Sequence, residues 1–211
     1  VGASLVGLMD LDAVDLVEPV MVFLRKEPDL NGIGGSAQRQ YIDLISSSWP
    51  EEQFRYWIVS QEVAEYLCFN AGGNLEGDGW SIGRQDFATF LGILALYSID
   101  YADVADWTKS MYIEHPDHAL YWRLVDRYGI AWIGDLFRLM RQDSVDFRRV
   151  PAPKRGLTFV AYLSMACDEN LADLCDESGF GWKPYDWESR FPDTPFEECR
   201  FSRENIEELM N

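Results

Sequence analysis

Basic side chains are scarce in this chain of 211 residues. Lys and Arg together number 18 against 36 Asp and Glu, so the formal net charge is −18. Proteins that bind the phosphates of DNA or RNA, or that dock on an anionic membrane surface, need a surplus of positive charge. The charge therefore argues against both kinds of binding and predicts that an electrostatic partner is a basic protein.

Long apolar segments are also missing. No stretch approaches the roughly 18 uninterrupted apolar residues of a membrane-spanning helix. The mildly apolar residues 1–9 include no basic side chain and are followed at once by acidic ones, so we expect no signal peptide. The four cysteines are few for the length and irregularly spaced, which suits reduced thiols better than disulfides. Together these features predict a cytoplasmic protein with no membrane partner.

The usual signatures of catalysis are absent as well. The sequence contains no G-x-S-x-G, no S-x-x-K, no Walker loop and no C-x-x-C pair. Such patterns place a nucleophile, a phosphate-binding loop or a pair of thiolate ligands. We therefore expect no cofactor and no bound metal, and a binding protein is favoured over an enzyme.

Apolar residues are nonetheless abundant enough to form a core. Hydrophobic residues make up 47% of the sequence and aromatic residues 14%. Along successive segments they recur at steps of three and four, the period of an amphipathic helix. The predicted fold class is mainly α: an irregular multi-helix bundle with a less regular C-terminal quarter that is rich in Pro and aromatic residues. The five clearest helices are expected at residues 49–69, 84–97, from Asp100 onward, 116–128 and 131–142.

Local signals place the ends of these helices. Ser48 and Glu51 form a capping box at the start of the first one. Asp100 is expected to cap the third, which would turn Trp107 and Met111 inward. Because the connections are short, neighbouring helices should pack antiparallel around one core. Ten residues are expected to meet there: Phe54, Trp57, Ile58, Phe87, Phe90, Leu94, Trp107, Leu120, Leu124 and Phe137.

Other segments have weaker patterns. Residues 37–46 are predicted to be helical, and residues 157–177 to hold one or two helices, although 157–160 is also compatible with a strand. Short apolar runs do not separate a strand from a helix, so residues 19–24 stay open between the two. A last helix is expected at 203–210.

Charge is unevenly distributed along the chain. Residues 138–155, which we call the basic belt, hold six basic residues against two acidic ones. Residues 156–211 reverse this balance, with 13 acidic residues against four basic ones. The basic residues of the belt are Arg138, Arg141, Arg148, Arg149, Lys154 and Arg155.

Two prolines in the belt mark a candidate boundary. Pro151 and Pro153 prevent the segment around them from being helical throughout. We predict a helical core domain at residues 1–150 and an acidic C-terminal subdomain at 151–211 packed on it. The alternative is a single domain.

Two segments carry residues that bind metals in other settings. Residues 74–78 begin like an EF-hand loop, but the twelfth position is Gln85 rather than a bidentate Glu, and a Gly-rich loop between helices is the alternative. His115 and His118 lie close enough in sequence to share a metal. However, Asp117 is a natural helix cap, which favours an exposed helix N-terminus for this segment instead.

The acidity leads to a functional hypothesis. Small acidic proteins without a catalytic signature include immunity proteins, phage-borne inhibitors and nucleic-acid mimics. An acidic surface speeds association with a cationic partner, and aromatic residues among the carboxylates can anchor it. We hypothesise an inhibitor or immunity-type protein that neutralises a basic, nucleic-acid-handling target, with DNA mimicry as one route. The predicted partner-binding residues are Asp173, Asp176, Glu177, Trp182, Asp186, Trp187 and Glu188.

Three alternatives remain open from the sequence. One is a small metal-dependent enzyme that uses the His115/His118 segment or residues 74–78. Another is a structural subunit of a larger assembly. The third is that the charge serves solubility alone.

Overall fold

The structure is a computed structural model that describes residues 2–9, 21–25, 35–37, 41–45, 52–70, 86–147 and 149–180. This part of the chain is mainly helical, as predicted, and it also contains a small three-stranded sheet. The helices are α1 (Gly2–Leu8), α2 (Glu52–Asn70), α3 (Phe87–Ser98), α4 (Ala102–Tyr112), α5 (Pro116–Tyr128), α6 (Ala131–Gln142), α7 (Ala152–Ala166) and α8 (Ala172–Ser178). The strands are β1 (Met21–Arg25), β2 (Gly35–Ala37) and β3 (Tyr41–Ile45).

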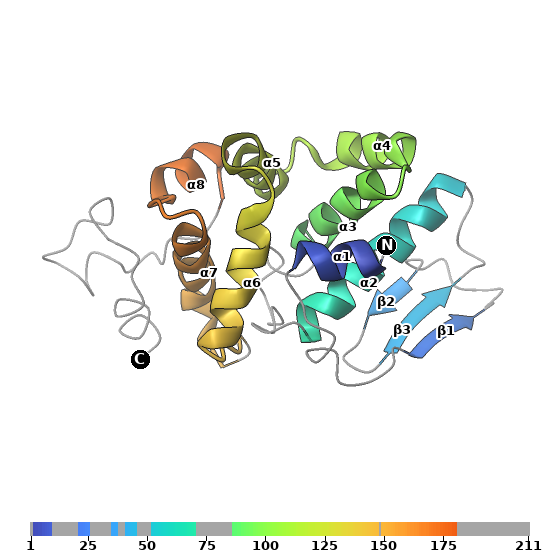
Figure 1. Ribbon diagram of the computed structural model, residues 1–211, viewed down its shortest axis with the longest axis horizontal. Helices are drawn as coiled ribbons and strands as arrows, with labels where there is room; N and C mark the ends of the chain where they lie inside the picture. The colour runs from blue at the N-terminus through green and yellow to red at the C-terminus, as the bar shows by residue number, and fades with distance from the viewer. Residues whose placement is uncertain are drawn as a thin grey trace, which may run out of the picture.

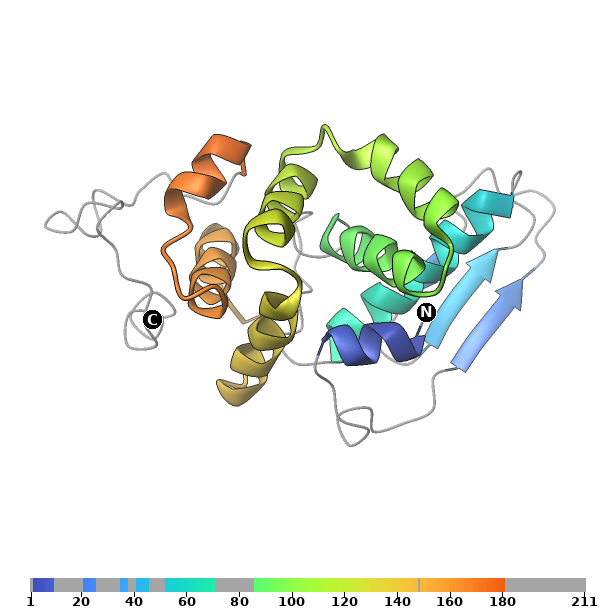
Figure 2. The same ribbon diagram turned by 45° about the horizontal axis from the view of Figure 1, so that its top comes forward.

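Helix α3 lies at the centre of the bundle. Its sequence is apolar on nearly every side, so only an enclosed position removes it from water. It contacts α1, α2, α4 and α5, and both views show it among these helices (Figures 1 and 2). Gly92 permits the close approach of α2, because a Cβ at that position would lie 3.1 Å from the backbone carbonyl carbon of Ser60.

The remaining elements lie at the two ends of the molecule. The sheet lies beside α2 at one end, whereas α7 and α8 lie at the other (Figure 1). Helix α6 packs on α7, and α5 packs on α8. The turn between α4 and α5 passes above α3 in the view of Figure 2. It links α4, which packs on α2 and α3, to α5, which packs on α8.

The sheet corrects the prediction of a helix at residues 37–46. Strand β3 is its middle strand, parallel to β1 and antiparallel to β2. Ile42 and Leu44 are buried, so the apolar positions that matter alternate with a period of two. Helix α2 packs against β2 and β3 and buries that face. Residues 19–24, for which the sequence left strand and helix undecided, form a strand from Met21 onward.

Two details of α4 differ from expectation. Its N-cap residue is Tyr101, not Asp100. Asp100 has φ of 63° and ends α3 instead, where the Tyr101 N–H donates to the Leu96 carbonyl at 3.0 Å, the bond of a Schellman motif. Met111 is 41% exposed rather than inward, because the buried side of α4 is a narrow stripe on a peripheral helix.

Helix boundaries elsewhere follow the sequence closely. The fifth predicted helix coincides with α6, and the fourth with α5. Residues 157–160 are helical within α7, which begins directly after its N-cap residue Pro151. Pro153 lies in the first turn, where proline is tolerated because no N–H partner is needed. Several predicted features lie outside the described residues: the capping box of Ser48 and Glu51, Gln85, the irregular C-terminal quarter beyond Phe180, and the helix at 203–210.

The predicted core is confirmed. Its aromatic centre is Phe87, whose ring lies 5.0 Å from that of Tyr121 and 5.6 Å from that of Phe159. Of the ten predicted residues, Trp107 is half-buried and reaches the core through the Trp57 ring at 6.3 Å. Three more are half-buried and pack against the core: Phe54, Trp57 and Leu94. The other six are buried in the core: Ile58, Phe87, Phe90, Leu120, Leu124 and Phe137.

One hydrophobic cluster includes residues from either side of the predicted domain boundary. Phe159 and Tyr162 of α7 belong to it together with the residues of α3 and α5. The division into residues 1–150 and 151–211 stays a prediction, because most of the acidic quarter lies outside the described residues.

Candidate functional site

The histidine segment forms the start of α5. His115 is the N-cap residue with extended backbone, Pro116 follows in the first turn, and Asp117 and His118 come next. Asp117 is therefore not the cap, contrary to expectation. The helix end is exposed at His115 and Pro116, as expected, but His118 is completely buried because it lies on the side of α5 that faces the core.

His118 lies beside the carboxyl group of Asp86, which in turn contacts that of Asp117. Its Nε2 atom lies 3.7 Å from Oδ1 of Asp86, the residue that precedes α3. The Asp86 and Asp117 carboxyls are hydrogen-bonded to each other. Neither ring nitrogen of His118 has a hydrogen-bond partner in the part of the chain that the structure describes. We call Asp86, Asp117 and His118 the carboxyl–imidazole cluster.

Burial moves the pKa values of this cluster away from their ordinary ranges. Burial and the adjacent Asp86 carboxylate raise the pKa of Asp117 to about 7. Burial also raises the pKa of Asp86, against smaller opposing effects of the Asp117 hydrogen bond and His115. Burial, and then His115, lower the pKa of His118 to about 4. Near neutral pH Asp117 is therefore partly protonated while the imidazole is neutral.

Tyrosines enclose the cluster. The Tyr112 ring stacks on the His118 ring with centroids 5.0 Å apart, and the Tyr121 ring meets it edge-on at 6.4 Å. Burial and the Asp86 carboxylate raise the pKa of Tyr112. Residues at the start of α3, in α4 and in α5 each contribute to this site, which is a largely buried polar junction beside the aromatic core.

The metal hypotheses find no support from the described residues. Within the described ranges, no group of three or more His, Cys, Asp and Glu side chains is arranged to hold a metal ion. His115 and His118 meet edge-on with ring centroids 6.4 Å apart. The EF-hand-like residues 74–78 lie outside the described part of the chain.

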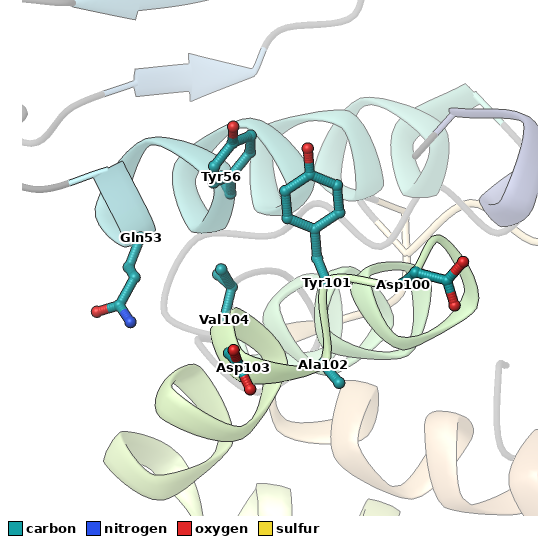
Figure 3. Close-up of a pocket in the computed structure, with 7 residues that line it drawn as sticks. All are labelled: Gln53, Tyr56, Asp100, Tyr101, Ala102, Asp103 and Val104. Carbon is teal, nitrogen blue, oxygen red and sulfur yellow. The ribbon is translucent and has the colours of Figure 1, made fainter.

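A second feature is a surface pocket of about 500 Å³ between α2 and the start of α4. Figure 3 shows Gln53 and Tyr56 of α2 facing Tyr101 and Val104 across it, with Asp100 and Asp103 on different sides of Tyr101. The Tyr56 and Tyr101 rings lie 4.5 Å apart at an angle of 50°. We call this the tyrosine pocket; its complete lining is Gln53, Tyr56, Asp100, Tyr101, Ala102, Asp103 and Val104.

The carboxylates of the tyrosine pocket have no counter-ion within the described ranges. Asp100 and Asp103 are exposed, and neither forms an ion pair with any part of the chain that the structure describes. Asp103 lies in the first turn of α4, where the helix dipole favours its negative charge. The pocket thus presents fixed negative charge beside exposed aromatic surface.

Three of the predicted partner-binding residues lie on α8. Asp173, Asp176 and Glu177 are exposed there. Glu177 is 3.4 Å from Arg123 of α5, so part of this acidic face is already paired within the molecule. The other four predicted residues lie outside the described residues: Trp182, Asp186, Trp187 and Glu188.

The basic belt is largely used inside the fold. Arg155 is only 8% exposed, and its Nε–H donates to the carbonyls of Phe147 and Val150 at 2.9 Å each. Lys154 is 8% exposed as well. Arg138 pairs with Asp135 in the same helix. Arg155 thus holds the α6–α7 connection in place, whereas Arg138 and Arg149 are exposed and pair with nearby aspartates of their own segments.

The described cysteines behave as structural thiols, as expected. Cys68, Cys167 and Cys175 form no disulfide. Burial raises the pKa of all three thiols, which keeps them protonated and unreactive.

Comparison with protein-family models, curated proteins and solved structures gives no match. The functional argument therefore depends on this chain alone.

Sequence reasoning overlooked Asp86 and the tyrosine pocket. Asp86 acquires its role only because α3 begins beside the first turn of α5. Tyr56 and Tyr101 are separated in sequence and come together because α2 packs on α4. The only local signal was the placement of Tyr101 between two aspartates.

Proposed function

We propose that this protein binds a basic protein partner through its acidic surface. The observation that supports the proposal most directly is the tyrosine pocket, where Asp100 and Asp103 have no counter-ion among the described residues and lie near the half-buried Tyr56 and the exposed Tyr101. A negative surface with aromatic anchors raises the rate of association with a cationic protein and selects against other partners.

Internal pairing of the bases is compatible with the proposal. Arg127 pairs with Glu169 at 2.5 Å and Arg149 with Asp146 at 3.6 Å. Arg123 pairs with Glu177. Each of these pairs uses one acidic and one basic side chain, so it leaves the net surplus of 18 negative charges unchanged.

The partner class is the finer part of the proposal. We place the target among basic nucleic-acid-handling enzymes or toxins, with this chain as their inhibitor or immunity protein and DNA mimicry as one mode of binding. A target whose own ligand is a polyanion carries the cationic surface that this chain would occupy. A cytoplasmic location accompanies the proposal, and the free thiols of the described cysteines support it. No helix among the described residues is long and apolar enough to cross a membrane.

The decisive experiment starts with a pull-down from native lysate. Association rates of the isolated partner are then measured between about 50 and 300 mM salt, over which the Debye length falls by more than half. We expect the association rate to fall steeply with salt and the dissociation rate to change little. A partner that binds with no salt dependence, or an acidic partner, would contradict the proposal.

A second candidate function is acid–base catalysis at the carboxyl–imidazole cluster. It is favoured by the opposite pKa changes of Asp117 and His118, since groups whose pKa values are driven apart are typical acid and base pairs. Hydrolysis of a panel of chromogenic esters, amides and glycosides would test it. Activity that Asp117→Asn abolishes and Asp126→Asn retains would support catalysis; no turnover of any of them leaves binding as the function.

A further inference from the structure

The tyrosine pocket combines three kinds of surface. Val104 supplies a buried apolar floor, and the tilted Tyr56–Tyr101 pair supplies aromatic faces. Gln53 and Asp103 add an amide and a carboxylate at the rim. Tyr101 is 38% exposed, so its ring is accessible to a partner. The volume of about 500 Å³ falls in the range of pockets that hold small ligands or single side chains.

This combination selects a cation. The faces of tyrosine rings attract positive charge, and the Asp103 carboxylate has no counter-ion in the described part of the chain. An anion would be repelled by Asp100 and Asp103. A purely apolar side chain would leave the carboxylate and the Gln53 amide without new partners, so it gains less from the same pocket.

Among cations, the pocket fits a guanidinium better than an ammonium. A guanidinium is planar, stacks on aromatic rings and carries donors in a fork that matches a carboxylate. An ammonium is a compact, strongly hydrated charge that gains less from a ring face. The methylene chain of arginine would lie along Val104 while the head group reaches Asp103.

We propose that the tyrosine pocket binds an arginine side chain of the basic partner. The inference rests on the proposed function and adds the residue that the partner must present. Arginine is enriched at the energetic centres of protein interfaces, where it fills pockets of this kind.

The experiment compares tetra-arginine and tetra-lysine peptides, which carry equal charge. Each is titrated into the isotope-labelled full chain at about 50 mM salt, a concentration that screens weakly, and amide chemical shifts are followed by NMR. We expect tetra-arginine to bind about three- to fivefold more tightly, with the largest shifts at Tyr101, Asp103 and Val104. Asp103→Asn and Tyr101→Ala should remove this preference, whereas Tyr101→Phe keeps it because the ring remains.

Asp126→Asn is the matched control, since Asp126 is exposed on α5 away from the pocket. It should lower the affinity for both peptides equally and slightly. Equal affinity of the two peptides, failure of tetra-arginine to bind, or shifts centred elsewhere would overturn the arginine proposal. The proposed function would then still be judged by the salt dependence of the natural partner, so the two failures are distinguishable.

Discussion

Two adjacent residues, Asp117 and His118, have pKa values displaced in opposite directions, and this affects stability. Between about pH 4 and 6.5 the unfolded chain binds a proton at His118 that the folded chain does not bind, so this group makes stability rise with pH. Between pH 3.8 and about 7 the folded chain retains a proton at Asp117 that the unfolded chain releases, so stability falls with pH. Asp86 acts in the same sense as Asp117. In the native protein the contribution of His118 to the pH dependence of stability therefore opposes that of the two aspartates.

Replacing the imidazole should reveal the carboxyl contribution. In His118→Phe the unfolding free energy should fall with rising pH more steeply than in the wild type, by up to about 1.4 kcal/mol per pH unit between about pH 4 and 6.5. Urea unfolding at several pH values measures the slope. An unchanged slope would mean that His118 titrates at its ordinary pKa in the folded protein.

Replacing the carboxyl group should have the opposite effect. Asp117→Asn removes the group that loses its proton near pH 7, so the variant should gain stability relative to the wild type as pH rises from about 4 to 7. The same substitution also alters the hydrogen bond through which Asp117 lowers the pKa of Asp86. Asp126→Asn, exposed on the same helix, is the control and should retain the wild-type dependence. Equal slopes for the two variants would contradict the raised pKa of Asp117.

At the level of elements, α3 determines how the other helices pack. Phe90 is fully buried, and its ring contacts those of Tyr121 at 5.1 Å and Trp122 at 5.2 Å on α5. Phe90→Ala should lower the unfolding free energy by roughly 3–5 kcal/mol, because it leaves a cavity among rigid rings. Ile130→Ala, at a position that is 50% exposed, should cost less than about 1 kcal/mol. Similar losses for the two variants would show that α3 is not the centre of the core.

The contact between α2 and α3 depends on Gly92. Alanine normally stabilises a helix by about 1 kcal/mol over glycine. Here its Cβ would lie 3.1 Å from the Ser60 carbonyl carbon and 3.2 Å from the Gln61 nitrogen, which are backbone atoms of α2 that cannot move aside locally. We expect Gly92→Ala to lower the melting temperature and Gly7→Ala, with open space at its Cβ, to raise it slightly. A stabilised Gly92→Ala would show that the two helices separate easily.

At the scale of the whole molecule, charge governs association. Suppose that the acidic quarter, residues 156–211, contributes to the partner contact. The double variant Asp186→Lys with Glu188→Lys should then slow association and flatten its salt dependence without unfolding the chain. The reason is that peripheral charges act mainly on the on-rate. Trp187→Ala should instead speed dissociation, as expected for an anchor. Rates are measured by surface plasmon resonance against the isolated partner. Unaltered kinetics in these variants would restrict the contact to surfaces such as the tyrosine pocket.

Patterns local in the sequence determined much of this protein. The three- and four-residue repeat of apolar residues was sufficient for α5 and α6, because an amphipathic helix carries its own period. The acidity followed from counting residues. The segment 37–46 was predicted incorrectly because its apolar residues also fit a helical spacing, and only pairing with β1 and β2 selects the strand.

Tertiary structure alone decided the candidate sites. Asp86 and His118 come from different helices, so their approach, and the burial that changes their pKa values, cannot be obtained from either local sequence. The same holds for Tyr56 and Tyr101, and for Arg123, which pairs with Glu177 of α8. Secondary structure is encoded over a few neighbouring residues, whereas electrostatic environment depends on distance and dielectric in space. The sequence therefore determined most of the helices, although not α1, and it determined the charge; the fold decided which charges face one another and which remain for a partner.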